Sequence, residues 1–184
     1  MGSEMCIRDS FGDGSRFGVR IHWSPEDHLL GTAGGTALAR RHFRDAFFVW
    51  YGDNMSNLRL DDLAALHERG AAKATMALHH RDDVSASGIV DVDESGRVLR
   101  FLEKPAADEV FSHWVNAGVY VLEPSVLDTV PAGVAWDFGR QVFPGLLAAG
   151  ETIMGYRMDA DEHLRWIDRS EDLAKAEAAA ASAS

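Results

Sequence analysis

The stretch Ala46-Phe47-Phe48-Val49-Trp50-Tyr51-Gly52-Asp53 decides how this chain is expected to fold. Its unbroken apolar run, which ends at Tyr51, is typical of a buried strand. Gly52 and Asp53 follow directly, so a carboxylate stands at the carboxyl end of that strand. Open α/β sheets bind their ligands at this end of their strands. The stretch therefore predicts an α/β sheet with Asp53 at its functional edge.

Outward from this strand, apolar runs alternate with helical patterns along the chain. Further strands are predicted at 19–23, 74–78, 89–93, 97–101, 115–122, 153–158 and 165–167. Helices are predicted at 32–43, 60–69, 124–130 and 138–149, and from residue 170 onward. The turn at 94–96 joins two of the strands in a β-hairpin. Together these elements predict an α/β fold with a Rossmann-like, mixed and mostly parallel sheet, helices on both faces and an inserted hairpin.

The composition is that of an ordinary globular protein and excludes several classes. With 18 basic and 29 acidic residues the formal charge is -11, and no basic stripe is present, so a nucleic-acid partner is not expected. No apolar stretch approaches the roughly 20 residues that span a bilayer, and no signal peptide opens the chain. Cys6 is the only cysteine, which excludes an intramolecular disulfide and a cysteine zinc cluster. We therefore expect a cytoplasmic protein without a membrane partner.

The chain divides into three parts of unequal character. Residues 1–10 show neither helix nor strand periodicity, and we interpret them as a non-native leader, either a tag or a junction. Residues 11–176 carry the alternating pattern of a single, partial domain. Residues 177–184 form an alanine-rich tail that is expected to fray.

Two short motifs have the chemistry of ligand binding, and each also has a purely structural explanation. Leu30-Gly31-Thr32-Ala33-Gly34 opens a predicted helix with small residues, which lets a flat or anionic ligand approach the backbone. A tight loop with close helix packing explains it equally well. In Glu103-Lys104-Pro105, the carboxylate can accept hydrogen bonds from sugar hydroxyls while the ammonium faces a phosphate. A solvated strand end is the alternative.

Together with Gly52-Asp53, Asn116-Ala117-Gly118 and Trp166-Ile167-Asp168, these motifs occur in the order of one enzyme family. The chain resembles the sugar-phosphate nucleotidyltransferases, also called NDP-sugar pyrophosphorylases, and is similar to mannose-1-phosphate guanylyltransferases and glucose-1-phosphate thymidylyltransferases. The resemblance covers residues 11–176. It implies an enzyme that converts a sugar-1-phosphate and a nucleoside triphosphate into an NDP-sugar and pyrophosphate with Mg²⁺. The base and the sugar stay open.

The resemblance also implies roles for particular residues. Asp53 and Asp168 would bind the metal ion and, with Lys104, carry the catalysis. Contacts to substrates are implied for Gly31, Thr32 and Gly34, against the nucleotide, and for Gly88, Glu103, Lys104 and Asn116, in the sugar-phosphate site. After Asp168, the residues Arg169 and Ser170 depart from the Thr-Pro continuation that is usual in the family.

The opening of the family domain, a strand followed by a Gly-Gly-x-Gly-Thr-Arg loop and a Lys-Pro segment, does not occur in this sequence. We therefore expect an N-terminally truncated fragment with an uncovered sheet edge, able to self-associate as a homo-oligomer and with little or no activity alone. The alternative is a noncatalytic sugar-nucleotide-binding or regulatory module. A glycosyltransferase of the GT-A type is a third and weaker alternative. Asp91-Val92-Asp93 looks like the metal motif of such an enzyme, but its alternation places both carboxylates on the solvent face of a hairpin.

Overall fold

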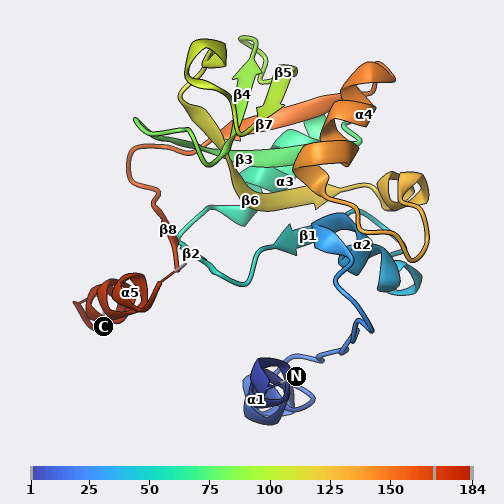
Figure 1. Cartoon of the computed structure of the whole chain (residues 1–184), viewed down its shortest axis with the longest axis vertical. Helices are drawn as coiled ribbons and strands as arrows, with labels where there is room; N and C mark the ends of the chain where they lie inside the picture. Colours follow the sequence, from blue (N-terminus) through green and yellow to red (C-terminus); the bar gives the residue numbers. More distant parts are fainter. Residues whose placement is uncertain (1, 168, 183–184) are drawn as a thin grey trace.

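The computed structural model describes residues 2–167 and 169–182, and a six-stranded sheet forms its centre (Figure 1). The strands are β1 (Phe47–Trp50), β3 (Ala74–His80), β4 (Gly88–Val92), β5 (Val98–Glu103), β6 (Trp114–Leu122) and β7 (Ile153–Arg157). Their order is β5-β4-β6-β3-β7, and β1 also pairs with β6. Because β6 is antiparallel to β1, β3 and β4, while β3 and β7 are parallel, β1, β3, β4 and β7 run in one direction. The predicted mixed sheet is confirmed.

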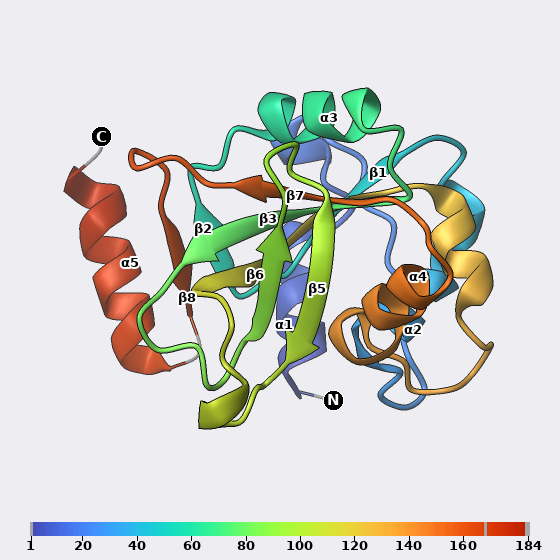
Figure 2. The same cartoon turned by 90° about the horizontal axis from the view of Figure 1, so that it is seen from above.

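Helices cover both faces of this sheet, as the sequence predicts. The helix α3 (Leu60–Arg69) packs Leu63 against Ala77 on one face. On the other face, α2 (Gly31–Leu38) and α4 (Phe143–Ala148) pack Ala33 and Phe143 in the cluster that contains Met76. Met76 and Ala77 face opposite ways because successive side chains of a strand alternate. Figure 2 shows α3 and α4 on different sides of the sheet.

Shorter helical turns connect these elements. They are the 3-10 turns Ser15–Phe17, Arg40–His42, Ala107–Glu109 and Pro124–Thr129, and the π turn Phe138–Val142, which leads directly into α4. The predicted helix at 138–149 is therefore present, with a wider first turn. The predicted helix at 32–43 divides into α2 and a 3-10 turn.

The hairpin β4–β5 forms as predicted. Of the two carboxylates before its turn, Asp91 and Asp93, the second has a structural role in the turn. Asp93 Oδ1 accepts hydrogen bonds from the backbone N–H groups of Ser95 (2.8 Å) and Arg97 (2.9 Å). These bonds, with that from the Ser95 hydroxyl, hold the pKa of Asp93 below its usual range. Asp93 therefore stabilises a turn, as the hairpin interpretation of this segment requires.

A second, two-stranded sheet lies beside the end of β1. It consists of β2 (Asn54–Ser56) and β8 (Leu164–Trp166), which are antiparallel with Asn54 opposite Trp166. Ile167 N donates a hydrogen bond to Asp53 O at 2.8 Å. Two motifs more than a hundred residues apart in sequence are thereby joined through their backbones. The helix α5 (Ser170–Ser182) follows.

Three expectations for the first 50 residues are corrected. Residues 2–11 form a helix, α1 (Gly2–Phe11), although the sequence shows no helical periodicity there. Its apolar side chains Ile7 and Phe11 are exposed. Residues 19–23 form no strand: their alternation finds no partner strand, and the Val19 side chain is 57% exposed. The strand β1 is only half buried, because its outer edge pairs with no described strand and Phe48 is 45% exposed.

Among the residues that the structure describes, none of the helices has the length and apolar character needed to cross a membrane.

Candidate active site

A cleft of about 430 Å³ opens beside the hairpin, and we call it the main cleft. Five of the residues singled out from the sequence line it together, although they come from four separate segments of the chain. They are Thr32, Gly88, Glu103, Lys104 and Asn116. The other lining residues are Tyr51, Ala86, Ser87, Gly118, Asp137, Gly139, Arg140 and Trp166.

A second hollow of about 470 Å³ adjoins the main cleft and contains Asp53. Its walls come from α2 and from β1 with the turn that follows it, and it shares Thr32 and Tyr51 with the main cleft. The Asp53 side chain is exposed at the end of β1, where the sequence predicted a functional carboxylate. The two hollows therefore form one continuous surface, with Tyr51 and Thr32 at the boundary.

Two glycines border the carboxylate of Glu103 in the main cleft. A Cβ atom at Gly88 would lie 2.6 Å from Glu103 Oε2, and a Cβ atom at Gly139 would lie at the same distance. Burial raises the pKa of Glu103, while the charges of Lys104 and Arg140 act in the opposite direction. Glu103 is thus a partly desolvated acceptor whose position depends on the absence of side chains on both sides.

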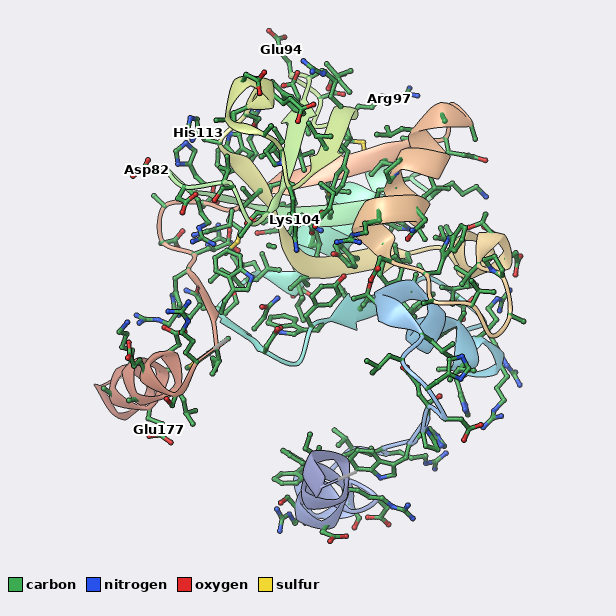
Figure 3. All side chains as sticks on the ribbon, in the orientation of Figure 1. Asp82, Glu94, Arg97, Lys104, His113 and Glu177 are labelled. Atoms are coloured by element: carbon green, nitrogen blue, oxygen red, sulfur yellow. The ribbon has the colours of Figure 1, made fainter. Side chains whose placement is uncertain are left out.

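Lys104 has an unusual backbone conformation. Its φ is +51°, in the left-handed region that costs a residue other than glycine about 1–2 kcal/mol. The residue before a proline also prefers extended backbone, and Pro105 follows. Lys104 N donates to Ser87 O at 3.1 Å, and Figure 3 shows the side chain below the hairpin, toward the middle of the molecule. Strained residues of this kind cluster at ligand sites.

A bulge in β6 positions Asn116. The register between β3 and β6 shifts between Met76 and Leu78, and Gly118 at this point has a φ of +72°. Gly118 N donates to Asn116 Oδ1 at 3.1 Å, and Asn116 Nδ2 donates to Tyr120 Oη at 2.8 Å. Each polar atom of the amide keeps one further hydrogen-bonding position, so Asn116 can still bind a ligand.

The small residues that open α2 pack against the loop before the π turn. Trp136 O accepts hydrogen bonds from Ala33 N (2.9 Å) and Gly34 N (3.0 Å). A Cβ atom at Gly31 would lie 2.8 Å from the same oxygen, and one at Gly34 would lie 3.0 Å from Val134 O. Close packing thus explains Gly31 and Gly34, neither of which lines the main cleft. Their contact with a nucleotide stays a prediction.

Thr32, by contrast, faces both hollows and is bonded to Asp137. Thr32 N and Thr32 Oγ1 donate to Asp137 Oδ1, each at 3.2 Å, and Phe138 N donates to Thr32 Oγ1 at 3.0 Å. These bonds hold the carboxylate of Asp137 in the main cleft, which Glu103 also lines. The negative charge of Asp137 raises the pKa of Glu103 further.

The donor set for a metal ion is partly described. Asp53 offers one exposed carboxylate, Asp168 lies outside the described residues, and no group of three His, Cys, Asp or Glu gathers within the described ranges. Magnesium is often bound by one or two carboxylates, with phosphate and water as its other ligands. A lone carboxylate on the wall of an open hollow fits that mode. Beside it, Asn54 Oδ1 is buried without a hydrogen-bond partner.

Sequence reasoning missed Tyr51, Gly118, Asp137, Gly139 and Arg140 as lining residues. Asp137 stands directly before a predicted helix, where an acidic residue ordinarily interacts with the helix start. Nothing in the sequence pairs it with Thr32, which is 105 residues away. Gly118 did carry a signal, because a glycine inside a strand pattern often marks a bulge.

Comparisons with known proteins agree on one family. Residues 3–179 match the family model described as Nucleotidyl transferase. The chain is 35% identical over 176 residues to a UTP–glucose-1-phosphate uridylyltransferase from Synechocystis, covering 88% of this chain and 44% of that protein. It is 41% identical over 151 residues to a mannose-1-phosphate guanylyltransferase from Mycobacterium tuberculosis, covering 79% of this chain and 41% of that protein. The chain therefore spans less than half the length of these curated relatives.

Solved structures show the same fold. HddC from Yersinia pseudotuberculosis, complexed with GMP-PN, superimposes with a TM-score of 0.73 at 20% identity, covering 93% of this chain and 72% of HddC. The same protein in a second crystal structure gives a TM-score of 0.74. At such low identity the likeness concerns the fold alone.

Proposed function

Since this chain belongs to the nucleotidyl transferase family, we propose that its protein transfers a nucleotidyl group from a nucleoside triphosphate to a sugar-1-phosphate. The membership confirms the resemblance drawn from the sequence motifs. In the proposed reaction, a phosphate oxygen of the sugar-1-phosphate forms a bond to the α-phosphorus. The bond from that phosphorus to the oxygen bridging it to the β-phosphorus breaks, and pyrophosphate leaves. The observation that carries the proposal is the main cleft, which joins Glu103, Lys104 and Asn116 to the hollow of Asp53.

The residues of the main cleft would hold the sugar-1-phosphate. Glu103 accepts hydrogen bonds from sugar hydroxyls, and Asn116 offers one donor and one acceptor position to the same ring. Lys104 places its ammonium against the phosphate as a point charge. Because transfer of a phosphoryl centre depends mainly on positioning and charge neutralisation, these contacts would align the attacking oxygen rather than react themselves.

The second hollow would hold the triphosphate and the metal ion. We assign Asp53 and Asp168 as metal ligands, with Mg²⁺ as the ion, because carboxylate and phosphate oxygens are the ligands it prefers. When bound, the ion would neutralise charge on the phosphates. The proposal extends to the cytoplasm, where such substrates are available, and to a homo-oligomer, which would cover the exposed edge of β1 with its Phe48.

Calorimetric titration with glucose-1-phosphate and mannose-1-phosphate tests this assignment without requiring turnover. We expect binding of at least one sugar phosphate, weakened about tenfold or more by Lys104→Gln, since a charge-assisted contact contributes roughly 1.5–3 kcal/mol. The control is Arg69→Gln, which removes an equal charge from the exposed last turn of α3. Pyrophosphate release with each triphosphate then separates an enzyme from a binding module. Absence of sugar-phosphate binding, or equal affinity in Lys104→Gln, contradicts the proposal.

A further inference from the structure

Tyr51 lies where the main cleft and the second hollow meet, and it lines both. Its ring is fixed by its surroundings. It makes an edge-on contact with Tyr120, with ring centres 5.6 Å apart, and a Cβ atom at Gly118 would lie 2.8 Å from it. Tyr51 N also donates to Gly118 O at 3.0 Å. The position of its hydroxyl is therefore determined before any ligand binds.

The hydrogen bonds around the two tyrosines have one preferred direction. Asn116 Nδ2 donates to Tyr120 Oη, and the Tyr120 hydroxyl donates to Tyr51 Oη at 3.2 Å. The opposite direction would leave the Tyr120 proton without an acceptor in a fully buried site, which is costly. Among the described residues, the Tyr51 hydroxyl also lies within hydrogen-bonding reach of the Thr32 side chain, whose own hydroxyl donates to Asp137 Oδ1. The Tyr51 hydroxyl thus lies at the boundary of the two hollows, where a ligand hydroxyl can replace Thr32 as its partner.

This donor stays protonated at neutral pH. Burial raises the pKa of Tyr51, hydrogen bonds with Thr32 and Tyr120 partly offset this, and the negative charges of Asp137 and Glu103 raise it further, so that the pKa is higher than usual. The same two carboxylates line the main cleft and are acceptors only. Around Tyr51 the cleft therefore combines one neutral donor with two anionic acceptors, and Lys104 and Arg140 are the cations that line it as well.

A hydroxyl group matches that combination, because it donates and accepts at once. A phosphate oxygen could accept from Tyr51, but Asp137 and Glu103, the charges that act on this hydroxyl, would repel it there. The phosphate is instead assigned to Lys104. We propose that Tyr51 is a specificity-determining residue that donates a hydrogen bond to one sugar hydroxyl, which in turn donates to Glu103 or Asp137. This inference rests on the proposed function, since it assumes that the main cleft receives a sugar phosphate.

Deoxy analogues of the ligand test the inference. Calorimetry would compare wild type and Tyr51→Phe with glucose-1-phosphate, mannose-1-phosphate and their monodeoxy derivatives. The substitution retains the ring and removes the hydroxyl. We expect the parent sugar phosphate to bind about 3- to 10-fold more weakly, as for the loss of a neutral hydrogen bond. One monodeoxy analogue should bind both proteins equally, because its missing hydroxyl is the partner of Tyr51.

The matched control is Tyr156→Phe. The Tyr156 hydroxyl donates to Glu162 Oε2 at 3.0 Å and lies outside the main cleft, so its removal should leave every affinity unchanged. Equal weakening of all analogues by Tyr51→Phe would mean that the hydroxyl serves packing alone and would overturn the inference. No weakening would overturn it as well. If wild type binds no sugar phosphate, the proposed function fails and the inference with it; if wild type binds but the analogues do not separate, only the inference fails.

Analogue binding to wild type alone provides a second readout if Tyr51→Phe proves unstable. At least one monodeoxy analogue must then bind about 3-fold or more weakly than its parent. Equal affinity of all analogues for wild type would overturn the inference.

Discussion

Gly118→Ala is the substitution that most directly tests how the bulge in β6 builds the site. Gly118 has a φ of +72°, which glycine adopts freely and alanine does not. The added Cβ would also lie 2.7 Å from Asn54 Nδ2 and 2.8 Å from the Tyr51 ring. Neither neighbour can move easily, since the Asn54 amide is buried and donates to Ala117 O at 2.8 Å. The substitution therefore combines backbone strain with overpacking.

The expected loss of stability follows from these two effects. A left-handed residue other than glycine costs about 1–2 kcal/mol. Overpacking of a closely packed interior adds about 1–3 kcal/mol. Together they lower the free energy of unfolding by about 2–5 kcal/mol, which for a chain of this size corresponds to a fall in Tm of roughly 4–20 °C.

Two other glycines serve as controls in the same thermal and denaturant unfolding experiments. Gly133 has a φ of +70° but no atom within 4 Å of its added Cβ, so Gly133→Ala carries the strain alone, about 1–2 kcal/mol. Gly145 lies in α4 with open space around it, and Gly145→Ala should stabilise by about 0.5–1 kcal/mol. A Gly118→Ala variant no less stable than Gly133→Ala would refute the argument that close contact shapes this bulge.

Three further predictions concern the site and its surroundings. Gly139→Ala should change stability by less than about 1 kcal/mol, because the added Cβ comes too close only to the end of the Glu103 side chain and touches Phe101 at an ordinary distance. It should nevertheless weaken sugar-phosphate binding at least about tenfold, and unchanged affinity by calorimetry contradicts this. In denaturant unfolding, Lys104→Gly should be about 1 kcal/mol more stable than Lys104→Ala, because glycine adopts the φ of +51° at this position without strain. Both variants should bind the sugar phosphate more weakly. Equal stabilities of the two variants would show that the backbone of Lys104 is not strained. The pKa of all three tyrosines is raised, and burial raises that of Tyr156 to about 12. Because the tyrosine pKa values of the folded chain exceed the unfolded value of about 10, the folded state favours the neutral phenols. This contribution to the free energy of unfolding is complete below about pH 10 and is lost as the pH rises toward 12. A rise of phenolate absorbance near about pH 10 in the folded chain would contradict this.

The sequence predicted correctly those helices and turns that are determined by neighbouring residues in the chain. The helix α3 begins after Arg59 with acidic residues in its first turn and ends at Gly70, where a helix stop is expected. The hairpin formed because its turn residues match the geometry between β4 and β5. Five predicted ligand residues share the main cleft. Gly88, which begins β4, pairs with Glu103 at the end of β5, and Asn116 in β6 follows Val115, the partner of Ile89.

Other features depend on partners that a sequence pattern does not contain. The alternation at 19–23 describes a strand only if a neighbouring strand pairs with it, and none of the described strands does. The half-buried state of β1 has the same cause. In the sequence, Tyr51 is simply the last residue of an apolar run. Its place between the two hollows depends on its hydrogen bond with Tyr120, which lies on another strand. Pairings across 69 residues of sequence leave no local periodicity.

The small residues that open α2 were explained either by ligand binding or by close packing, and the first N–H groups of this helix connect the two explanations. The carbonyl of Trp136 and the carboxylate of Asp137 already accept the hydrogen bonds of the N–H groups at Thr32 and the next two positions. These donors therefore hold the loop at 136–139 rather than an anionic ligand. That loop carries Asp137 into the main cleft, and its Gly139 borders the carboxylate of Glu103. Close packing at the start of α2 thus determines the shape of the main cleft, so a motif that packs a loop also positions the acceptors that a sugar would meet.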